Sequence, residues 1–170
     1  MEQCQNLTPR KNISPYELGN ACQLIGKDWM LICAGDNAMT ASWGGMGVLW
    51  NKPVAYLFIR PQRHTYTMTE SNDRFSLAFF DESYRGALRY FGTKSGRDGD
   101  KFERSGLTCA YTESGVPYPE EAQMVMICRK LYADDIKECA FVDKSLLSNY
   151  AAADYHKMYV MEIEKVIVKE

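Results

Sequence analysis

The sequence has little histidine, no excess of charge of either sign and no long apolar run. Its 170 residues contain two histidines, and 20 Lys and Arg against 22 Asp and Glu give a net charge of −2. Electrostatic binding of nucleic acid needs a basic face that neutralises phosphates, so the charge argues against that partner. No apolar run approaches the ~18 residues of a membrane-spanning helix, so we expect no membrane insertion. The length suits a single domain over residues 1–170.

The cysteines show neither redox nor metal-binding spacing. They stand at positions 4, 22, 33, 109, 128 and 139, and no two form a CxxC pair. His64 and His156 also lack a second ligand at a suitable spacing, so we expect no metal site. The N-terminus, MEQCQNLTPRKN, lacks the apolar stretch of a secretory signal. We therefore expect a cytoplasmic protein with reduced, mostly buried thiols, among which Cys33 and Cys128 lie in apolar runs.

Short apolar runs bounded by turn-forming residues predict a β protein. The expected strands cover residues 29–34, 54–59, 75–80, 124–132 and 159–168. Helical spacing predicts short helices over residues 82–90, 99–103 and 145–151, and residues 1–25 are expected to form an arm or a short helix. The first strands lie too close in sequence for helical crossovers, which favours an antiparallel barrel or sandwich.

Residues 37–47, NAMTASWGGMG, form the most unusual segment. Small and hydroxyl residues follow a predicted buried strand, and Trp43 and three glycines come next. Glycine lets backbone N–H groups approach a ligand, and Thr40 and Ser42 add hydroxyls on one face of a strand. Such a segment can line a flat polar ring system. The alternative is a hairpin with a glycine-rich turn and a core tryptophan.

The segment RPQRHTYT at residues 60–67 follows a predicted strand directly. A helix that begins near Thr65 would present free N–H groups and the positive end of its dipole to an anion. Arg60 and Arg63 add guanidinium groups suited to phosphate, with His64 beside them. The alternative is a solvated basic turn.

The segment GTKSGRDGDKF at residues 92–102 has the composition of a phosphate loop but not the spacing of a Walker A motif. Lys94, Arg97 and Lys101 with Ser95 can form a cationic lid over an anion. The aspartates at positions 98 and 100 either pair with these cations or cap the following helix. The alternative is a solvated charged loop.

In their order along the chain, these segments resemble the flavin reductase-like family of FMN-binding split-barrel proteins, in its flavoredoxin-like branch. The likeness begins near Trp29 and rests on the strings NAMTASW, KP, RPQRHTYT and SGRD with DKF, and on His156 before the last strand. It implies a mainly β fold, a six-stranded antiparallel Greek-key split barrel with connecting helices. It also implies a homodimer with one non-covalent FMN per subunit near the interface.

The resemblance also implies roles for individual residues. It places one motif along the isoalloxazine and ribityl chain, made of Asn37, Thr40, Ala41, Ser42 and Trp43. At the phosphate end it places Arg60, Arg63, His64, Thr65 and Tyr66. The loop that would close over the flavin or its phosphate consists of Lys94, Ser95, Gly96 and Arg97. His156 would lie near the ring.

The implied function is an FMN-dependent oxidoreductase, an NAD(P)H:flavin oxidoreductase that moves hydride or electrons between NAD(P)H and flavin or an acceptor. The acceptor is a small molecule or a protein. No residue is assigned as catalytic, because the flavin supplies the redox chemistry and the protein binds and orients it. Lys94 or a backbone N–H would stabilise the reduced ring electrostatically. The alternatives are a flavoredoxin-type electron carrier or flavin-binding module without NAD(P)H activity, and a structural β domain without a cofactor.

Overall fold

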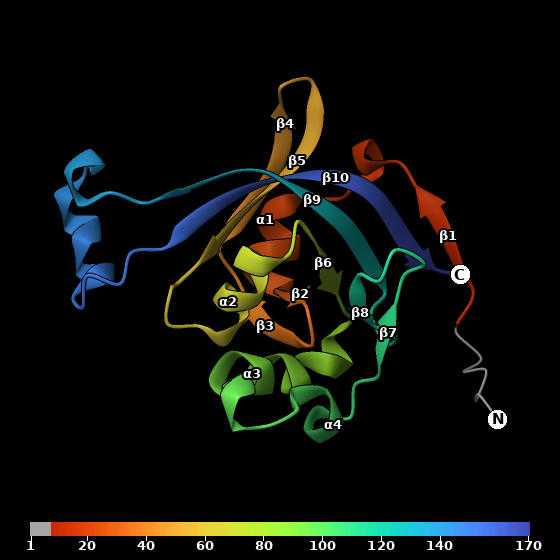
Figure 1. Cartoon of the computed structure of the whole chain (residues 1–170). Helices are drawn as coiled ribbons and strands as arrows, with labels where there is room; N and C mark the ends of the chain where they lie inside the picture. The colour runs from red at the N-terminus through yellow and green to blue at the C-terminus, as the bar shows by residue number, and fades with distance from the viewer. Residues whose placement is uncertain (1–7) are drawn as a thin grey trace.

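A strongly curved antiparallel sheet with helices packed against it forms the body of the molecule (Figure 1). The computed structural model describes residues 8–170. Its strands are β1 Arg10–Ile13, β2 Met30–Ala34, β3 Asn37–Ala41, β4 Gly44–Leu49, β5 Lys52–Ile59, β6 Arg74–Phe79, β7 Cys109–Tyr111, β8 Pro117–Pro119, β9 Met124–Asp135 and β10 Lys157–Lys169. Its α-helices are α1 Ala21–Gln23, α2 His64–Ser71, α3 Arg85–Thr93 and α4 Lys101–Ser105. Shorter helical turns are η1 Pro15–Glu17, η2 Leu24–Asp28, η3 Glu82–Tyr84, η4 Gly96–Asp98, η5 Glu138–Ala140 and η6 Lys144–Tyr150.

The sheet is a split barrel, as the resemblance implies. Its strand order is β3-β2-β6-β9-β10-β5-β4, with β1 paired to β10, and every pairing is antiparallel. The end strands β3 and β4 do not pair with each other, so the barrel is not closed. Within residues 8–170 the main sheet holds eight strands rather than the expected six, because β4 and β1 extend it.

Strand β2 separates two hydrophobic cores, which explains why the whole run is apolar. Met30, Ile32 and Ala34 face the core inside the curved sheet, whereas Leu31 and Cys33 face the core beneath α3 and α4. Successive side chains of a strand point to opposite faces, so a strand buried on both faces has no polar alternation. This double burial fixes β3, the neighbour of β2, between the barrel and α3.

All five predicted strands are confirmed. The helix predicted over residues 82–90 is confirmed as η3 and α3, and the helix predicted over residues 145–151 is confirmed as η6. The predicted helix over residues 99–103 is shifted to α4, because the Asp100 side chain accepts from the N–H groups of Phe102 and Glu103 and caps it there. The arm expected at residues 1–25 contains strand β1 beside the turns η1, α1 and η2; residues 1–7 lie outside the described residues.

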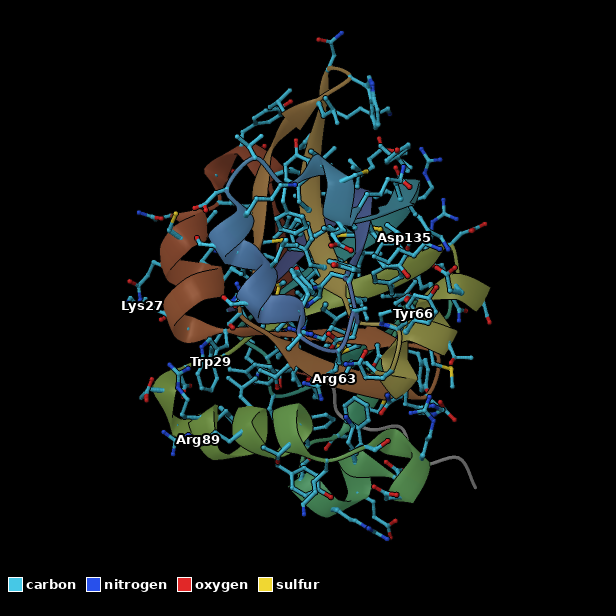
Figure 2. All side chains as sticks on the ribbon, turned by 90° about the vertical axis from the view of Figure 1, so that its left-hand side faces the viewer. Lys27, Trp29, Arg63, Tyr66, Arg89 and Asp135 are labelled. Carbon is cyan, nitrogen blue, oxygen red and sulfur yellow. The ribbon has the colours of Figure 1, made fainter. Side chains whose placement is uncertain are left out.

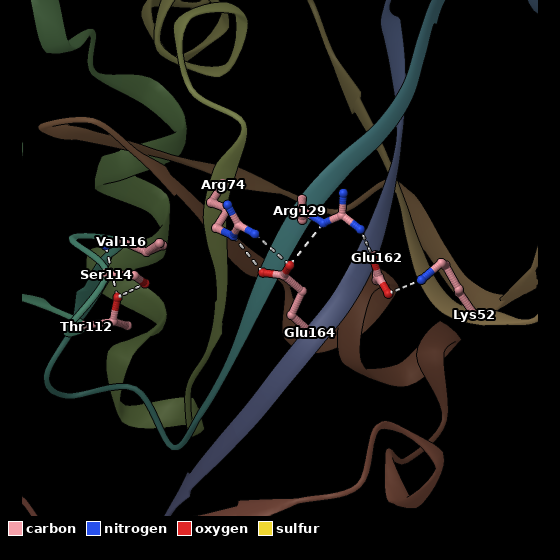
Figure 3. Close-up of polar contacts among 8 residues, drawn as sticks. All are labelled: Lys52, Arg74, Thr112, Ser114, Val116, Arg129, Glu162 and Glu164. Atoms are coloured by element: carbon pink, nitrogen blue, oxygen red, sulfur yellow. Dashed lines mark hydrogen bonds and ion pairs between the residues drawn. The ribbon is translucent and has the colours of Figure 1, made fainter.

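The outer face of the sheet carries a row of paired charges across four strands (Figure 3). Glu162 of β10 lies between Lys52 and Arg129, at 2.6 Å and 2.5 Å. Glu164 lies between Arg129 and Arg74, at 3.0 Å and 2.8 Å. Glu162 and Glu164 therefore lie on the outer face of β10, and apolar side chains of the same strand lie in the core.

The prediction that the thiols are mostly buried is wrong for the described cysteines. Cys33 and Cys128 are buried, and burial raises the pKa of both thiols. Cys22 and Cys139 are exposed on helical turns, and Cys109 is half-buried. The two exposed cysteines lie outside the main strands, in segments that pack little against either core. Cys4 lies outside the described residues.

The chain between the end of β9 and the start of β10 extends away from the body of the molecule (Figure 1). We call residues 136–156 the projecting segment; it carries η5 and η6 and holds an aromatic cluster of Phe141, Tyr150 and Tyr155. Val142 on it is 99% exposed. None of the helices described over residues 8–170 has the length and apolar character to span a membrane.

Candidate functional site

The three unusual segments converge on two adjoining cavities at the edge of the barrel. The larger has a volume of about 480 Å³ and the smaller about 190 Å³, within or near the range of small-molecule sites. They share Met39, Arg60 and Arg63, so together they form one elongated groove. The predicted residues that line the larger cavity are Asn37, Arg60, Arg63, His64, Thr65, Lys94, Ser95, Gly96 and Arg97. Those that line the smaller one are Thr40, Ala41, Ser42, Trp43, Arg60, Arg63 and His156.

Helix α2 begins at the floor of the larger cavity, close to the predicted position. Arg63 is its N-cap residue, so the first N–H groups of the helix face the region of the anion expected there. Thr65 is fully buried, and its hydroxyl oxygen accepts a 2.9 Å hydrogen bond from the amide of Asn37 on β3. This bond joins the start of α2 to the strand that carries the NAMTASW motif.

Tyr66 is the one predicted residue that lines neither cavity. Its N–H donates to the Arg63 carbonyl at 3.0 Å, and its ring packs against the barrel core. The Lys157 ammonium lies 5.7 Å from the centre of that ring. In Figure 2, Arg63 lies next to α3, and Tyr66 lies farther along α2. At 3.6 residues per turn, the Tyr66 side chain lies roughly 200° around the helix axis from that of His64, which lines the cavity, so Tyr66 points toward the barrel core.

Gly96 lines the larger cavity, and the side chains of Asn37 and His64 approach it closely. A Cβ atom at this position would lie 2.5 Å from Oδ1 of Asn37 and 2.8 Å from Cδ2 of His64. Both distances are too short for real contacts, so only glycine fits between β3 and α2 here. The SGRD string therefore docks against the Asn37–Thr65 pair and closes one wall of the cavity.

Cationic side chains dominate the wall of the larger cavity. Arg63 donates to the Gly92 carbonyl at the end of α3, and Arg97 donates to the Gln62 carbonyl, both at 3.0 Å. The cationic lining residues are Arg60, Arg63, Lys94, Arg97 and Lys101, and the carboxylate among the lining residues is Asp154. The cavity thus has an excess of positive charge in a protein whose total charge is −2.

Arg60 differs from the other cations because it is already paired. Its guanidinium contacts the carboxylate of Asp154 and donates to the Asn149 carbonyl at 3.0 Å. The Gln62 amide also donates to Asp154, at 2.7 Å. These hydrogen bonds, first from Gln62 and then from Arg60, lower the pKa of the Asp154 carboxyl. Arg60 therefore ties the projecting segment to the groove, and Arg63 and Arg97 remain the guanidinium groups without a carboxylate partner in the wall.

Lys101 is the most buried of the cations that line the larger cavity. It is 5% exposed, and its ammonium donates to the carbonyls of Phe91 and Lys94, both at 3.2 Å. Burial, followed by the charge of Arg63, lowers the pKa of Lys101 to about 8. A buried cation of this kind favours an anion in front of it.

The smaller cavity lies where β3 ends and β4 begins. The Thr40 hydroxyl donates to the Leu88 carbonyl of α3 at 2.5 Å, so its proton is not free for a ligand. Ala41, Ser42 and Trp43 follow, and Trp43 is 49% exposed at the mouth. The hairpin alternative with a core tryptophan is therefore wrong. The glycines lie within β4 rather than in a turn, and β3 and β4 pair with β2 and β5 instead of each other.

His156 stands beside Trp43, with the two ring centres 5.3 Å apart. Its Nδ1 atom shares a 2.9 Å hydrogen bond with the Tyr150 hydroxyl of the projecting segment. Burial, followed by the charge of Arg60, lowers the pKa of His156 to about 4. The imidazole is therefore neutral at neutral pH and offers hydrogen-bonding atoms rather than a charge.

Sequence reasoning missed several lining residues. They are Met39, Phe58, Gln62, Thr93 and Asp154, together with Lys101, which was assigned to the lid and not to the set of binding residues. Asp154 precedes His156 by two residues, and that proximity was a usable signal. Phe58 and Met39 lie in strands that read as core in the sequence, because apolar residues at a cavity mouth follow the same alternation as buried ones. Lys94 lies with the basic residues of the larger cavity, away from Trp43.

The fold is thus an open antiparallel split barrel with a basic groove beside a smaller pocket that Trp43 lines. The comparison of sequences agrees: residues 26–170 match the family described as "Flavin reductase like domain", and the chain belongs to that family. A comparison with curated proteins gives no match.

Solved structures share the fold at low sequence identity. The flavoredoxin of Desulfovibrio vulgaris (Miyazaki F) is 24% identical, with a TM-score of 0.66 over 84% of this chain and 69% of that one. An FMN-binding domain of a flavin reductase-like enzyme from Shewanella baltica OS155 is 14% identical, with a TM-score of 0.69 over 97% and 80% of the two chains. The NADH:FAD oxidoreductase of Streptomyces globisporus C-1027 is 13% identical, with a TM-score of 0.63 over 84% and 80%. Identities at this level establish the fold that the chains have in common.

Proposed function

We propose that the protein is an FMN-dependent oxidoreductase that takes hydride from NAD(P)H and passes electrons to a small-molecule or protein acceptor. The observation that carries this proposal is the composition of the groove. One end has five cationic side chains against one carboxylate, and the other end has Trp43 and the end of β3. A phosphorylated ligand with a flat ring system matches both ends.

The residues present fit FMN by their chemistry. The Thr65 hydroxyl accepts a hydrogen bond from Asn37 through its oxygen, and its proton would be donated to a phosphate oxygen. Arg63 and Arg97 are held by carbonyls rather than carboxylates, so their charge is not neutralised. These groups and the first N–H groups of α2 would hold the phosphate. When bound, the flavin supplies hydride and electron transfer.

At the other end of the groove, residues of the smaller cavity would orient the flavin ring and leave one face of that ring open to a reaction partner. The backbone and small side chains of Ala41 and Ser42 would lie along the ring, with Trp43 at its edge. Neutral His156 is fixed by Tyr150 and would offer a hydrogen bond near the ring. Since Lys94 lies at the basic end, stabilisation of the reduced ring would fall to backbone N–H groups.

The proposal includes a homodimer with the flavin near the interface. Its support is a set of exposed apolar side chains: Trp43 at the groove is 49% exposed, and Val142 and Leu146 of the projecting segment are 99% and 49% exposed. Analytical ultracentrifugation of the flavin-loaded protein tests it, and a monomer at all concentrations would exclude a dimeric site. The proposal treats residues 1–170 as one domain in the cytoplasm. Cys22 and Cys139 are exposed and have no disulfide partner among residues 8–170, which fits a reducing compartment.

The binding of FMN is tested by reconstitution and absorbance. The purified protein should take up added FMN and show the bands of bound flavin, and protein that stays colourless would exclude a flavin function. The double variant Arg63→Ala/Lys94→Ala should bind FMN more weakly, by tenfold or more, because two of the cations are removed. Lys27→Ala, on an exposed turn away from the groove, is the control.

A second candidate function is a flavoredoxin-type electron carrier without a nicotinamide site. The fold shared with the Desulfovibrio vulgaris flavoredoxin favours it. Anaerobic addition of NADH or NADPH to the flavin-loaded protein separates the two. Rapid bleaching supports the reductase, and flavin that stays oxidised until a protein or chemical reductant is added supports the carrier.

A further inference from the structure

The backbone and the imidazole of His156 are both held by hydrogen bonds. The His156 carbonyl accepts a 2.9 Å bond from the N–H of Ile136, which directly follows β9. Its Nδ1 atom shares a 2.9 Å bond with the hydroxyl of Tyr150, the last residue of η6. His156 is 7% exposed and Tyr150 is 8% exposed. The imidazole therefore has a fixed orientation in the wall of the smaller cavity.

Tyr150 is itself fixed within the projecting segment. Its ring stacks on that of Tyr155, with the ring centres 4.9 Å apart, and the Arg60 guanidinium lies 5.2 Å from its ring centre. Its carbonyl accepts a 2.9 Å hydrogen bond from the N–H of Ala153, which closes the turn that leads back to His156. The hydroxyl of Tyr150 is thus presented to the imidazole by a packed ring, and the contact is preorganised.

The number of protons decides which atom of this pair donates. A hydroxyl has one proton and two lone pairs, and a neutral imidazole has one N–H and one bare nitrogen. If Nδ1 of His156 carried the proton, it would donate to the Tyr150 oxygen, and the hydroxyl proton would then lack an acceptor among residues 8–170. A buried donor without an acceptor costs more free energy than an unused lone pair. The Tyr150 hydroxyl is therefore the donor, and Nδ1 is the acceptor.

This arrangement leaves the imidazole proton on Nε2, which is open to the cavity. Within the described part of the chain, Nε2 of His156 has no hydrogen-bond partner. The polar side-chain atoms there that lack a partner and are sealed from solvent belong to Arg10 and Glu120 instead. Nε2 is therefore accessible, and His156 lines the smaller cavity beside Trp43. The ring end of the groove thus has an N–H donor that the fold itself does not use.

We propose that Tyr150 is a positioning residue of this cavity: it fixes the tautomer and the orientation of His156, so that Nε2–H is a hydrogen-bond donor to the ligand. Tyr150 lines neither cavity, so it acts on the ligand through His156. The inference rests on the proposed function and adds to it a requirement on the ligand. The edge of the ligand that faces His156 carries an acceptor, such as a carbonyl oxygen or an unprotonated ring nitrogen, and a flavin ring has both.

NMR of the flavin-free protein tests the tautomer directly. The chain contains two histidines, so ¹⁵N-labelled histidine gives two imidazoles, and His64→Gln assigns them. Two-bond ¹H–¹⁵N correlations at neutral pH distinguish a protonated ring nitrogen from a bare one. We expect His156 to have a protonated Nε2 and a bare, hydrogen-bonded Nδ1. A protonated Nδ1 in the wild-type protein overturns the inference.

Two matched variants test the part of Tyr150 in that spectrum. Tyr150→Phe keeps the ring and removes the hydroxyl, so the Nδ1 resonance of His156 should move to that of an unbonded nitrogen. Tyr155→Phe removes a hydroxyl from the same aromatic cluster and should leave both nitrogen resonances unchanged. An Nδ1 resonance that does not move in Tyr150→Phe contradicts the inference.

Fluorescence titration with FMN and with riboflavin tests the effect on binding. Tyr150→Phe should weaken both ligands by about three- to tenfold, because the ring that they share loses one well-oriented hydrogen bond. Tyr155→Phe should bind both as the wild type does. In the His156→Gln background, Tyr150→Phe should have no further effect, since Tyr150 acts through His156. Losses of affinity that add in the double variant would show that Tyr150 supports the groove by packing alone, and would reject its positioning role.

Failure of the proposed function gives a different result. Wild-type protein that binds neither FMN nor riboflavin rejects the flavin function, while the spectra of the same flavin-free protein still decide the tautomer of His156. Flavin binding that Tyr150→Phe leaves unchanged rejects the role of Tyr150 and leaves the flavin function in place.

Discussion

The amide of Asn37 donates a 2.9 Å hydrogen bond to the hydroxyl of Thr65, and both residues are buried. The bond holds the first residue of β3 against the second residue of α2, 28 positions later in the chain. The SGRD loop then packs on this pair at Gly96. Three segments that are separate in the sequence thus meet at one buried polar contact.

Replacement of Thr65 by Val tests that contact. The change keeps the shape but leaves the Asn37 amide without its acceptor, and an unsatisfied buried donor costs about 1–3 kcal/mol. We expect the free energy of unfolding in urea to fall by that amount, with weaker FMN binding. Thr65→Ser keeps the hydroxyl and is the control; equal stability of the Val variant and the wild type would contradict the role of the bond.

Gly96→Ala should damage the site more than its size suggests. The added methyl group would lie 2.5 Å from Oδ1 of Asn37, so either the loop or the Asn37 side chain that is bonded to Thr65 must shift. We expect FMN affinity to fall by tenfold or more. The matched control is Gly86→Ala in α3, where nothing lies within 4 Å of the new methyl and helix propensity favours alanine by roughly 0.5–1 kcal/mol. Similar FMN affinities of the two variants, measured by fluorescence titration, would show that the close approach is unimportant.

His156 should make stability fall in mild acid. Its pKa is about 4 in the folded protein and 6.5 in the unfolded chain, so between these values only the unfolded chain takes up the proton. The free energy of unfolding should therefore be lost as pH falls from 6.5 to 4, by at most about 1.4 kcal/mol per pH unit.

The measurement compares wild type with His156→Gln, which cannot be protonated, by urea denaturation at several pH values. As pH falls, the free energy of unfolding of the wild type should decrease more than that of His156→Gln. A difference that does not change with pH would show that His156 is not held in its neutral form.

Trp43 should report flavin binding by fluorescence. It lines the smaller cavity, whereas Trp29 lies under the Arg85 guanidinium. Trp50 lies in the turn between β4 and β5, with its ring centre 6.5 Å from that of Tyr132 on β9. In a variant with Trp29→Phe and Trp50→Phe, added FMN should strongly quench the fluorescence of Trp43, the tryptophan that remains. Trp43→Phe, which keeps the other two, is the complementary variant and should show weaker quenching. Unquenched Trp43 in a protein that binds FMN would refute its place beside the ring.

Local pattern explains why the strands were predictable. The apolar run at Met30–Ala34 and the alternation at Lys157–Lys169 are set by residues adjacent in sequence, so no knowledge of the partner strand was needed. The same holds for the start of α2 and for the segments that line the groove. Strands β1, β3, β4, β7 and β8 were not predicted, because they are short, polar or glycine-rich and are stabilised by pairing with distant strands.

A net charge of −2 says nothing of its distribution, yet basic segments at residues 60–63 and 94–101 were visible in the sequence and do meet in one cavity. The sequence alone determined the family resemblance, the main strands and the set of segments that form the groove, because these depend on local composition and order. Only the tertiary structure decided that Tyr66 lines neither cavity, that Asp154 pairs with Arg60 and that Lys101 is buried with backbone carbonyls as partners. Those outcomes depend on contacts between distant residues and on exclusion of water, which no local pattern records.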